Sequence, residues 1–335
     1  MVKRAILIGS TYHGNGKKSE LEGVFTDIIT RRNNLIDSFG YKSENIIMLT
    51  DKYMLYPDLF EDYTQDYKTI MIQGSKVMYS SKTNIKYIIS KMIEESREDD
   101  ELFVQFAGHG IQKSQNVWNK KESDNKDEVY LALNNRGELE NLTDNELFTL
   151  FNPTPCKTIV IFDNCHSATI MDAPDVISYD MQNNKLVMRN ENNNNSFNKN
   201  IIVISGARDK DWSYDGTDYI SLQRNGIFTQ SLIESQRKIL ESKKEIRAGK
   251  LLGESTKWLY AYHNNTSLQL PHISGNFESI KDVEEYIIYS KKCENITERE
   301  VVVNNKSDTI ESDTIESDTN KILIDIMKNL LKKYF

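Results

Sequence analysis

The sequence has few cysteines, no concentrated basic stretch and no long hydrophobic run. Its three cysteines, Cys156, Cys165 and Cys293, are too few and too scattered for a disulfide framework, and no Cys-x-x-Cys pair suggests a zinc site. This cysteine usage indicates a reducing compartment. Nucleic-acid binding needs a basic stripe, so a net charge of −8 argues against nucleic acid as the main partner.

The apolar runs are also short at the N-terminus. The run before Gly9 is too short for the core of a signal peptide, and no stretch approaches the length that spans a membrane. We therefore expect a cytoplasmic protein without a membrane span. A chain of 335 residues with 38% hydrophobic content can bury one substantial core, which favours a single catalytic domain with a tail.

Apolar runs typical of buried strands alternate along the chain with segments of helical periodicity. This alternation, with long crossover connections, predicts an α/β protein in which a mostly parallel central sheet is flanked by helices. Turn residues and a capping box at Thr143 and Glu146 mark the element ends. Strands are expected at 4–9, 45–50, 102–106, 128–134, 157–162 and 200–205, and helices at 18–39, from 83, from 143, at 226–247 and at 249–262.

Two of these strands end in residues with catalytic chemistry. The run VQFAGHG leaves His109 at a strand tip, and IVIFDNCHS leaves Cys165 at another, 56 positions later. Ligands of parallel sheets bind at the carboxyl ends of the strands, so both residues are expected at the same edge. A thiol needs a neighbouring imidazole to become a thiolate at neutral pH. The pattern predicts a Cys–His peptidase.

The surroundings of this pair suggest further roles. Gly108 and Gly110 would let the backbone approach a scissile bond, and the amides of Gly110 and Cys165 are candidates for an oxyanion hole. His166 competes with His109 for the role of base. Because adjacent residues at a strand end point to opposite sides, His109 is preferred.

Three segments depart from the alternation of strands and helices. Residues 178–200 are rich in Asn without a sustained period and are expected to form an exposed, flexible loop. The SDTIE repeat cannot bury a core and suggests a tether, and the last residues have an amphipathic helical pattern. The chain is accordingly divided into a large catalytic part (1–177), a linker (178–200), a smaller part of the same domain (201–303), an acidic tether (304–320) and a terminal helix (321–335).

These motifs together resemble a metacaspase of the caspase-like clan of cysteine peptidases. The resemblance rests on GHG and DxCHS in this order, with RAILIG, ELEGVFTD, SGARD and QLPHIS, and covers about residues 3–280. It implies a caspase-like sandwich fold, a catalytic dyad of His109 and Cys165, and cleavage after Arg or Lys. It also implies that Asp27 and Asp163 present carboxylates to the basic side chain, as suits recognition of a guanidinium. Val24 and Ala107 depart from the family pattern and remove polarity from this pocket.

The resemblance further implies calcium as an activator, although an Asp after Thr143 also suits a helix N-terminus. The positions that match the family's calcium ligands are Asp124, Asp144, Asn145 and Asp172, where Asn145 replaces a usual Asp. Activation by cleavage is another expectation, and Lys185 and Arg189 in the 178–200 loop are the candidate self-cleavage sites. The family resemblance favours a monomer that acts on protein substrates. The alternative is a weakly active or inactive scaffold that works by protein–protein binding.

Overall fold

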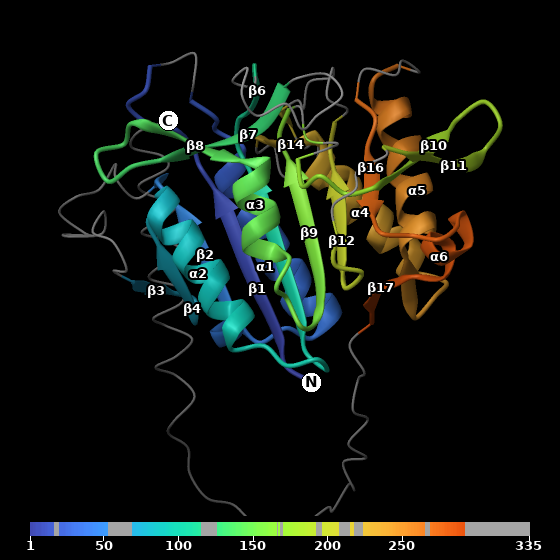
Figure 1. Ribbon diagram of the computed structural model, residues 1–335, viewed down its shortest axis with the longest axis horizontal. Coiled ribbons are helices and arrows are strands. Elements are labelled where there is room, and N and C mark those ends of the chain that lie inside the picture. Colours follow the sequence, from blue (N-terminus) through green and yellow to red (C-terminus); the bar gives the residue numbers. More distant parts are fainter. Residues whose placement is uncertain are drawn as a thin grey trace, which may run out of the picture. The chain divides into compact units, whose positions relative to one another are not determined.

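A ten-stranded sheet forms the centre of the computed structural model (Figure 1). Its strand order is β11-β10-β16-β12-β9-β5-β1-β2-β4-β3, and the run from β12 to β4 is parallel. The strands are β1 (Lys3–Gly9), β2 (Ile46–Thr50), β3 (Ile70–Ile72), β4 (Ser75–Met78), β5 (Glu101–Ala107), β9 (Lys157–Asp163), β10 (Asp175–Asp180), β11 (Lys185–Asn190), β12 (Ile201–Ser205) and β16 (His272–Gly275). The structure describes residues 1–16, 20–52, 69–114, 126–165, 167, 170–191, 196–207, 215–217, 224–264 and 269–291.

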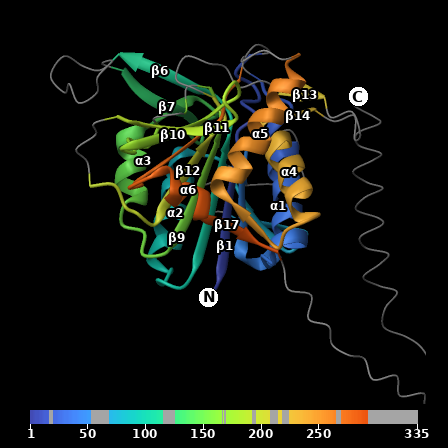
Figure 2. The ribbon, with the colours of Figure 1, turned by 90° about the vertical axis from the view of Figure 1, so that its right-hand side faces the viewer.

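Helices cover both faces of this sheet. Figures 1 and 2 show α2 and α3 on one face and α1, α4 and α5 on the other. Each face has its own core, because successive residues of a strand point to opposite sides: in β5, Phe103 packs with one core and Val104 with the other. The helices are α1 (Val24–Phe39), α2 (Lys82–Glu94), α3 (Asp144–Phe151), α4 (Ile227–Leu240), α5 (Ala248–Tyr262) and the short α6 (Ile280–Glu285), with a 3-10 turn at Ser43–Asn45.

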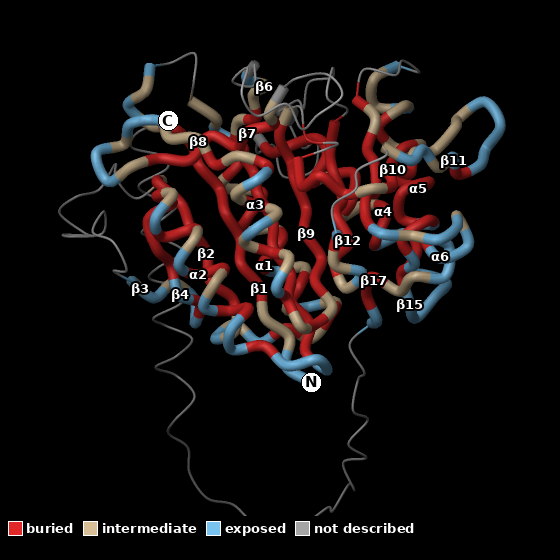
Figure 3. The backbone as a smooth tube through the Cα atoms, viewed as in Figure 1, coloured by how far each residue is buried: buried red, intermediate tan, exposed pale blue. Residues whose placement is uncertain are grey.

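The parallel strands are buried along almost their whole length. Every residue of β2, β5 and β12 is buried, and Figure 3 shows the burial concentrated in the central strands. A parallel sheet covered by helices on both faces needs such continuous apolar strands. The prediction of a mostly parallel sheet flanked by helices is confirmed.

Within the described residues, three small sheets accompany the central one. The first, β6-β7-β8, follows His109 and lies beside the carboxyl edge of the central sheet in Figure 1. The strand expected at 128–134 is present as β7, but it pairs with β6 and β8 and not with the central sheet. The strands are β6 (Gly110–Ser114), β7 (Lys126–Leu133), β8 (Leu139–Thr143), β13 (Asp215–Thr217), β14 (Arg224–Gly226), β15 (Glu245–Arg247) and β17 (Ile287–Ser290).

Local signals set several element ends. The capping box at Thr143 is formed, and Gly40 ends α1 in the left-handed conformation, with φ 73°. Two helices are shorter than expected. The first begins only after Gly23, and α4 ends at Leu240 because residues 245–247 pair with β17.

The expectation of an irregular loop over 178–200 is not met in its first part. Strands β10 and β11 form an antiparallel hairpin there, and Asn184 takes the left-handed conformation in its turn, with φ 51°. Leu186 is buried in the core beside α5, and Met188 packs against the same core. The Asn-rich composition concealed this two-residue alternation.

The tether and helix expected at 304–320 and 321–335 lie outside the described residues. The described residues belong to one unit, Met1–Cys293. Among them, no helix combines the length and the hydrophobicity needed to cross a bilayer.

Asp100, immediately before β5, binds the N-terminal segment of the chain through its carboxylate. Its carboxylate accepts hydrogen bonds from Val2 N at 2.6 Å and Arg4 Nη1 at 2.7 Å. Burial alone would raise the pKa of Asp100, but these bonds outweigh it and lower the pKa to about 2. Because the folded pKa is depressed, this stabilisation is present above pH 4 and is lost as the pH falls toward 2.

We therefore expect Asp100→Asn to lower the free energy of unfolding at pH 7 by about 1–2 kcal/mol, allowing for solvent screening. Urea denaturation at pH 7 and pH 2.5 measures this, and the difference from wild type should narrow at the lower pH. The neighbouring Asp99→Asn is the control, because Asp99 pairs with the N-terminus in an exposed position. A difference that stays constant with pH would contradict the assignment.

Candidate active site

The register between β5 and β9 brings the two predicted catalytic residues to one edge. Ala107 pairs with Asp163, so His109 and Cys165 each follow two residues beyond a paired position. The hydrogen bonding between the two chain segments continues past β5, because Gly108 N donates to Asp163 O at 3.3 Å. Both side chains are partly buried. His166, the competing base, lies outside the described residues.

Gly110 lies directly against the backbone of Cys165. A Cβ added at this position would lie 2.1 Å from the carbonyl oxygen of Cys165 and 2.2 Å from Nδ2 of Asn164. Only glycine therefore fits here without displacing the chain at Cys165. The Asn164 amide donates to the same carbonyl at 2.8 Å, which fixes the turn that carries the thiol.

The two predicted pocket carboxylates also converge, although 136 positions separate them. Asp27 on α1 accepts the backbone N–H of Gly226 at 2.8 Å, and Asp163 at the end of β9 approaches the same glycine. A Cβ at Gly226 would lie 2.3 Å from Asp163 Oδ2 and 3.0 Å from Asp27 Oδ2. Both carboxylates are nearly inaccessible, with 1% and 5% of Asp27 and Asp163 exposed.

A buried polar network holds Asp163. Its Oδ2 accepts the Thr229 hydroxyl at 2.7 Å, and that hydroxyl accepts from Gln105 Nε2 at 3.0 Å. Gln105 in turn accepts from Nε of Arg31 at 2.8 Å. Burial lowers the pKa of Arg31, while Tyr289, Asp27 and Asp163 act in the opposite direction. A buried cation therefore partly balances the two carboxylates.

Sequence reasoning missed most of this network. Gln105 is a polar residue in an otherwise apolar strand, and Arg31 follows Asp27 by one helical turn on a buried face. Both are signals of a buried polar contact, because an unpaired polar group is costly in a core. Thr229 and Gly226 carry no such signal.

The predicted calcium ligands are only partly brought together. Asp144 is buried, and its carboxylate accepts a hydrogen bond from Glu128 N at 2.8 Å. Its burial and, to a smaller extent, the nearby Asp172 raise the pKa of Asp144 to about 6. Asp127, which the sequence analysis did not select, also raises the pKa of Asp144. Asp172 is buried and has left-handed backbone, with φ 52°.

The other two predicted calcium ligands are Asn145 and Asp124. Asn145 is exposed, and its amide nitrogen, not its oxygen, faces Asp144 at 3.2 Å. Asp124 lies outside the described residues. Within the described part of the chain, no three acidic, histidine or cysteine side chains lie close enough to hold a metal ion. Carboxylate oxygens suit calcium, so Asp144 and Asp172 fit such an ion as two of its ligands.

The candidate self-cleavage residues lie on β11. Lys185 and Arg189 are both exposed, but their backbones pair with Asp180 and Val176 of β10. The Arg189 guanidinium also forms an ion pair with Glu191. These residues are accessible, yet their peptide bonds belong to an ordered hairpin.

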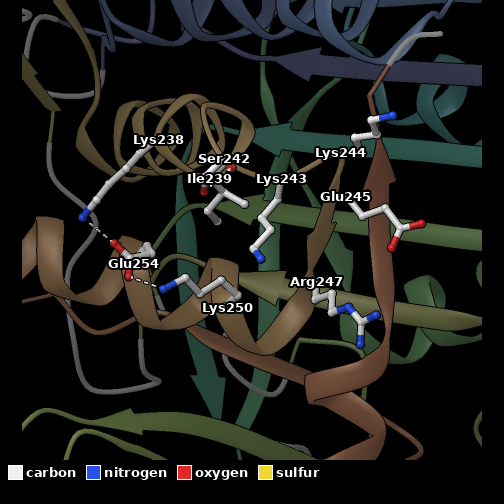
Figure 4. Close-up of a pocket in the computed structure, with 9 residues that line it drawn as sticks. All are labelled: Lys238, Ile239, Ser242, Lys243, Lys244, Glu245, Arg247, Lys250 and Glu254. Carbon is white, nitrogen blue, oxygen red and sulfur yellow. Dashed lines mark hydrogen bonds and ion pairs between the residues drawn. The ribbon is translucent and has the colours of Figure 1, made fainter.

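A groove of about 770 Å³ lies away from these residues, between α4 and α5 (Figure 4). Its lining includes five basic side chains, but Glu254 accepts from Lys238 at 2.6 Å and from Lys250 at 2.8 Å. These two lysines are thus already paired. None of the lining residues is His109, Cys165, Asp27 or Asp163.

The chain matches a known protein family over half of its length. Residues 3–174 match the model of the metacaspase, peptidase C14 domain, which covers half of the chain. The chain therefore belongs to the metacaspase family of peptidase C14 domains. It is 28% identical over 178 residues to Metacaspase-1B of Neurospora crassa and 29% identical over 174 residues to Metacaspase-3 of Arabidopsis thaliana.

The matched regions cover 52% and 51% of this chain but only 36% and 41% of those two relatives. The chain thus spans less than half the length of either relative. A crystal structure of a Geobacter sulfurreducens protein is also similar, with a TM-score of 0.54 and 16% identity over 87% of this chain and 100% of that one. This likeness concerns the fold alone.

Proposed function

We propose that this chain is a cysteine endopeptidase that hydrolyses peptide bonds after Arg or Lys, with Cys165 as nucleophile and His109 as general base and acid. The observation that carries the proposal is the β5–β9 register, which sets both residues equally far beyond one paired position. Membership of the metacaspase family supports the peptidase chemistry.

The reaction follows from these two groups. His109 takes the proton of the Cys165 thiol, and the thiolate attacks the scissile carbonyl carbon. The backbone amides of Gly110 and Cys165 donate to the oxyanion that forms. The imidazolium then protonates the leaving amine, which departs and leaves a thioester. Water attacks the thioester with His109 as base, and the carboxylic acid and free thiol are released.

Selectivity for a basic residue is assigned to Asp27 and Asp163. Two carboxylates that converge on one backbone position would suit a guanidinium or ammonium group and would repel an acidic side chain. The polar network through Thr229 supports Asp163 in this orientation. Val24 and Ala107 are both buried apolar residues, so the pocket depends on the two carboxylates for its polarity.

The first test measures cleavage of fluorogenic peptides ending in Arg, Lys, Asp or Asn. We expect turnover of the Arg and Lys peptides only, and none by Cys165→Ala. Asp163→Asn should lower kcat/KM for the Arg peptide by about 10- to 100-fold, because each hydrogen bond to a charged group contributes about 1.5–3 kcal/mol.

Asp175→Asn is the matched control, because Asp175 is another buried carboxylate, bonded to Asn190 and Phe277. It should leave the preference for Arg unchanged. If the wild type cleaved the Asp and Asn peptides as fast as the Arg and Lys peptides, the assignment of Asp27 and Asp163 to selectivity would be wrong. Absence of cleavage by the wild type, with or without calcium, would favour a binding scaffold over an enzyme.

We also propose that calcium stimulates the enzyme through Asp144 and Asp172, with Asp124 as a further ligand. The support is the burial of Asp144 at the start of α3 and the raised pKa of its carboxyl, about 6, to which burial contributes most and Asp172, seven residues after Cys165, also contributes. A bound calcium ion would neutralise carboxylates held close together. Its binding would tie the segment after the nucleophile to α3.

Thermal unfolding tests this proposal without reference to activity. Calcium at 100 times its dissociation constant should stabilise the wild type by about 2.7 kcal/mol. Asp144→Asn should abolish this shift, whereas Asn145→Ala should retain it because Asn145 points its amide nitrogen toward Asp144. An unchanged calcium shift in Asp144→Asn would exclude this site.

Self-processing after Lys185 or Arg189 stays a prediction. Peptidases bind their substrates as accessible backbone, so the β10–β11 hairpin must open before either bond is cut. We expect slow cleavage of the wild type in calcium and none of Cys165→Ala. Intact-mass spectrometry of the incubated proteins measures it, and fragments ending elsewhere would contradict these sites.

A further inference from the structure

The aromatic ring of Tyr12 lies on the imidazole of His109. Their centroids are 4.7 Å apart and their planes differ by 30°. The Tyr12 hydroxyl accepts the backbone N–H of His109 at 2.8 Å and donates to the carbonyl of Leu131 at 2.7 Å. Leu131 N also donates to His109 O at 3.0 Å. Tyr12 therefore contacts both the side chain and the backbone of His109.

Tyr12 is held there in an unfavourable backbone conformation. Its φ is 57°, in the left-handed region that a bulky aromatic residue rarely adopts, and its side chain is fully buried. Asp51, buried at the end of β2, stabilises both neighbours. One carboxylate oxygen accepts Thr11 N at 2.6 Å, and the other accepts His13 N at 3.2 Å. The surrounding structure thus enforces the position of this ring.

Gly108 leaves room for the contact. A Cβ at this residue would lie 2.5 Å from the Tyr12 hydroxyl oxygen and 2.9 Å from that of Tyr130. A larger residue before His109 would push the Tyr12 hydroxyl away from the backbone that it bonds. The glycine preceding the histidine is therefore explained by the tyrosine as well as by substrate access.

We propose that Tyr12 is a positioning residue for His109, which it holds by stacking and by its hydroxyl. This inference rests on the proposed function of the His109–Cys165 pair. Tyr12 contacts the face of the imidazole and so fixes the plane of that ring. The two nitrogens lie at the edge of the imidazole, so the contact does not cover them. The ring face also favours a cation, so Tyr12 stabilises the imidazolium that forms when Cys165 loses its proton.

The test compares Tyr12→Phe, which keeps the stack, with Tyr12→Leu, which loses it. The readouts are kcat, KM and the pH dependence of Cys165 alkylation by iodoacetamide, measured on that residue by peptide mass spectrometry. We expect Tyr12→Leu to lower kcat and the alkylation rate at pH 6.5 by about tenfold, the effect of one unit in the thiol pKa. KM should change less than twofold. Tyr12→Phe should recover most of both rates.

Tyr41→Leu controls for a general loss of stability. Tyr41 is another buried tyrosine, and its hydroxyl donates to Glu101, at the far end of β5 from His109. Equal effects of Tyr41→Leu and Tyr12→Leu, or an unchanged alkylation profile in Tyr12→Leu, would overturn the inference while leaving the dyad intact. If the single substitution His109→Ala leaves the alkylation of Cys165 as it is in the wild type, the dyad and the inference both fail.

Discussion

The parallel pairing of β5 with β9 is the constraint on which the candidate site depends. Seven consecutive residue pairs, from Glu101 with Lys157 to Ala107 with Asp163, align the two strands. Because a shift of one residue would turn every side chain to the opposite face, both covered faces oppose any other register. The chains beyond Ala107 and Asp163 therefore leave the sheet together. A nucleophile and a base need such a fixed relation, and buried hydrophobic strands supply it far more rigidly than loops.

The same sheet also carries the polar side chain of Gln105 into its interior. Gln105 points from the middle strand toward α1 and α4, where it bonds Arg31 and Thr229. Burying a guanidinium is costly unless its donors are satisfied and a counter-charge is near. Asp27 and Asp163 provide that charge, so the two carboxylates and the packing of two helices depend on one network. This coupling explains how two carboxylates can be buried close together.

Near the carboxyl edge of the sheet, two residues have backbone conformations that non-glycine residues rarely adopt. Tyr12 and Asp172 are both non-glycine residues with left-handed backbone. Strained conformations of this kind persist only where surrounding contacts determine them, and they concentrate at functional sites. Here Asp51 supports one, and the segment after Cys165 contains the other. Tyr12 contacts His109 directly, and Asp172 follows Cys165 by seven residues.

The amino-acid pattern by itself determined strands β1, β2, β5, β7, β9 and β12, most helices, the capping box at Thr143 and the residues at the two strand tips. These features depend on local periodicity and on turn chemistry, which are readable within a short window. Only the tertiary structure decided that Asp27 meets Gly226, that Tyr12 stacks on His109, and that residues 175–190 form a hairpin. Such contacts join distant positions, and their partners are set by strand order and helix packing. Periodicity shows that a residue is buried, but it does not show what the residue is buried against.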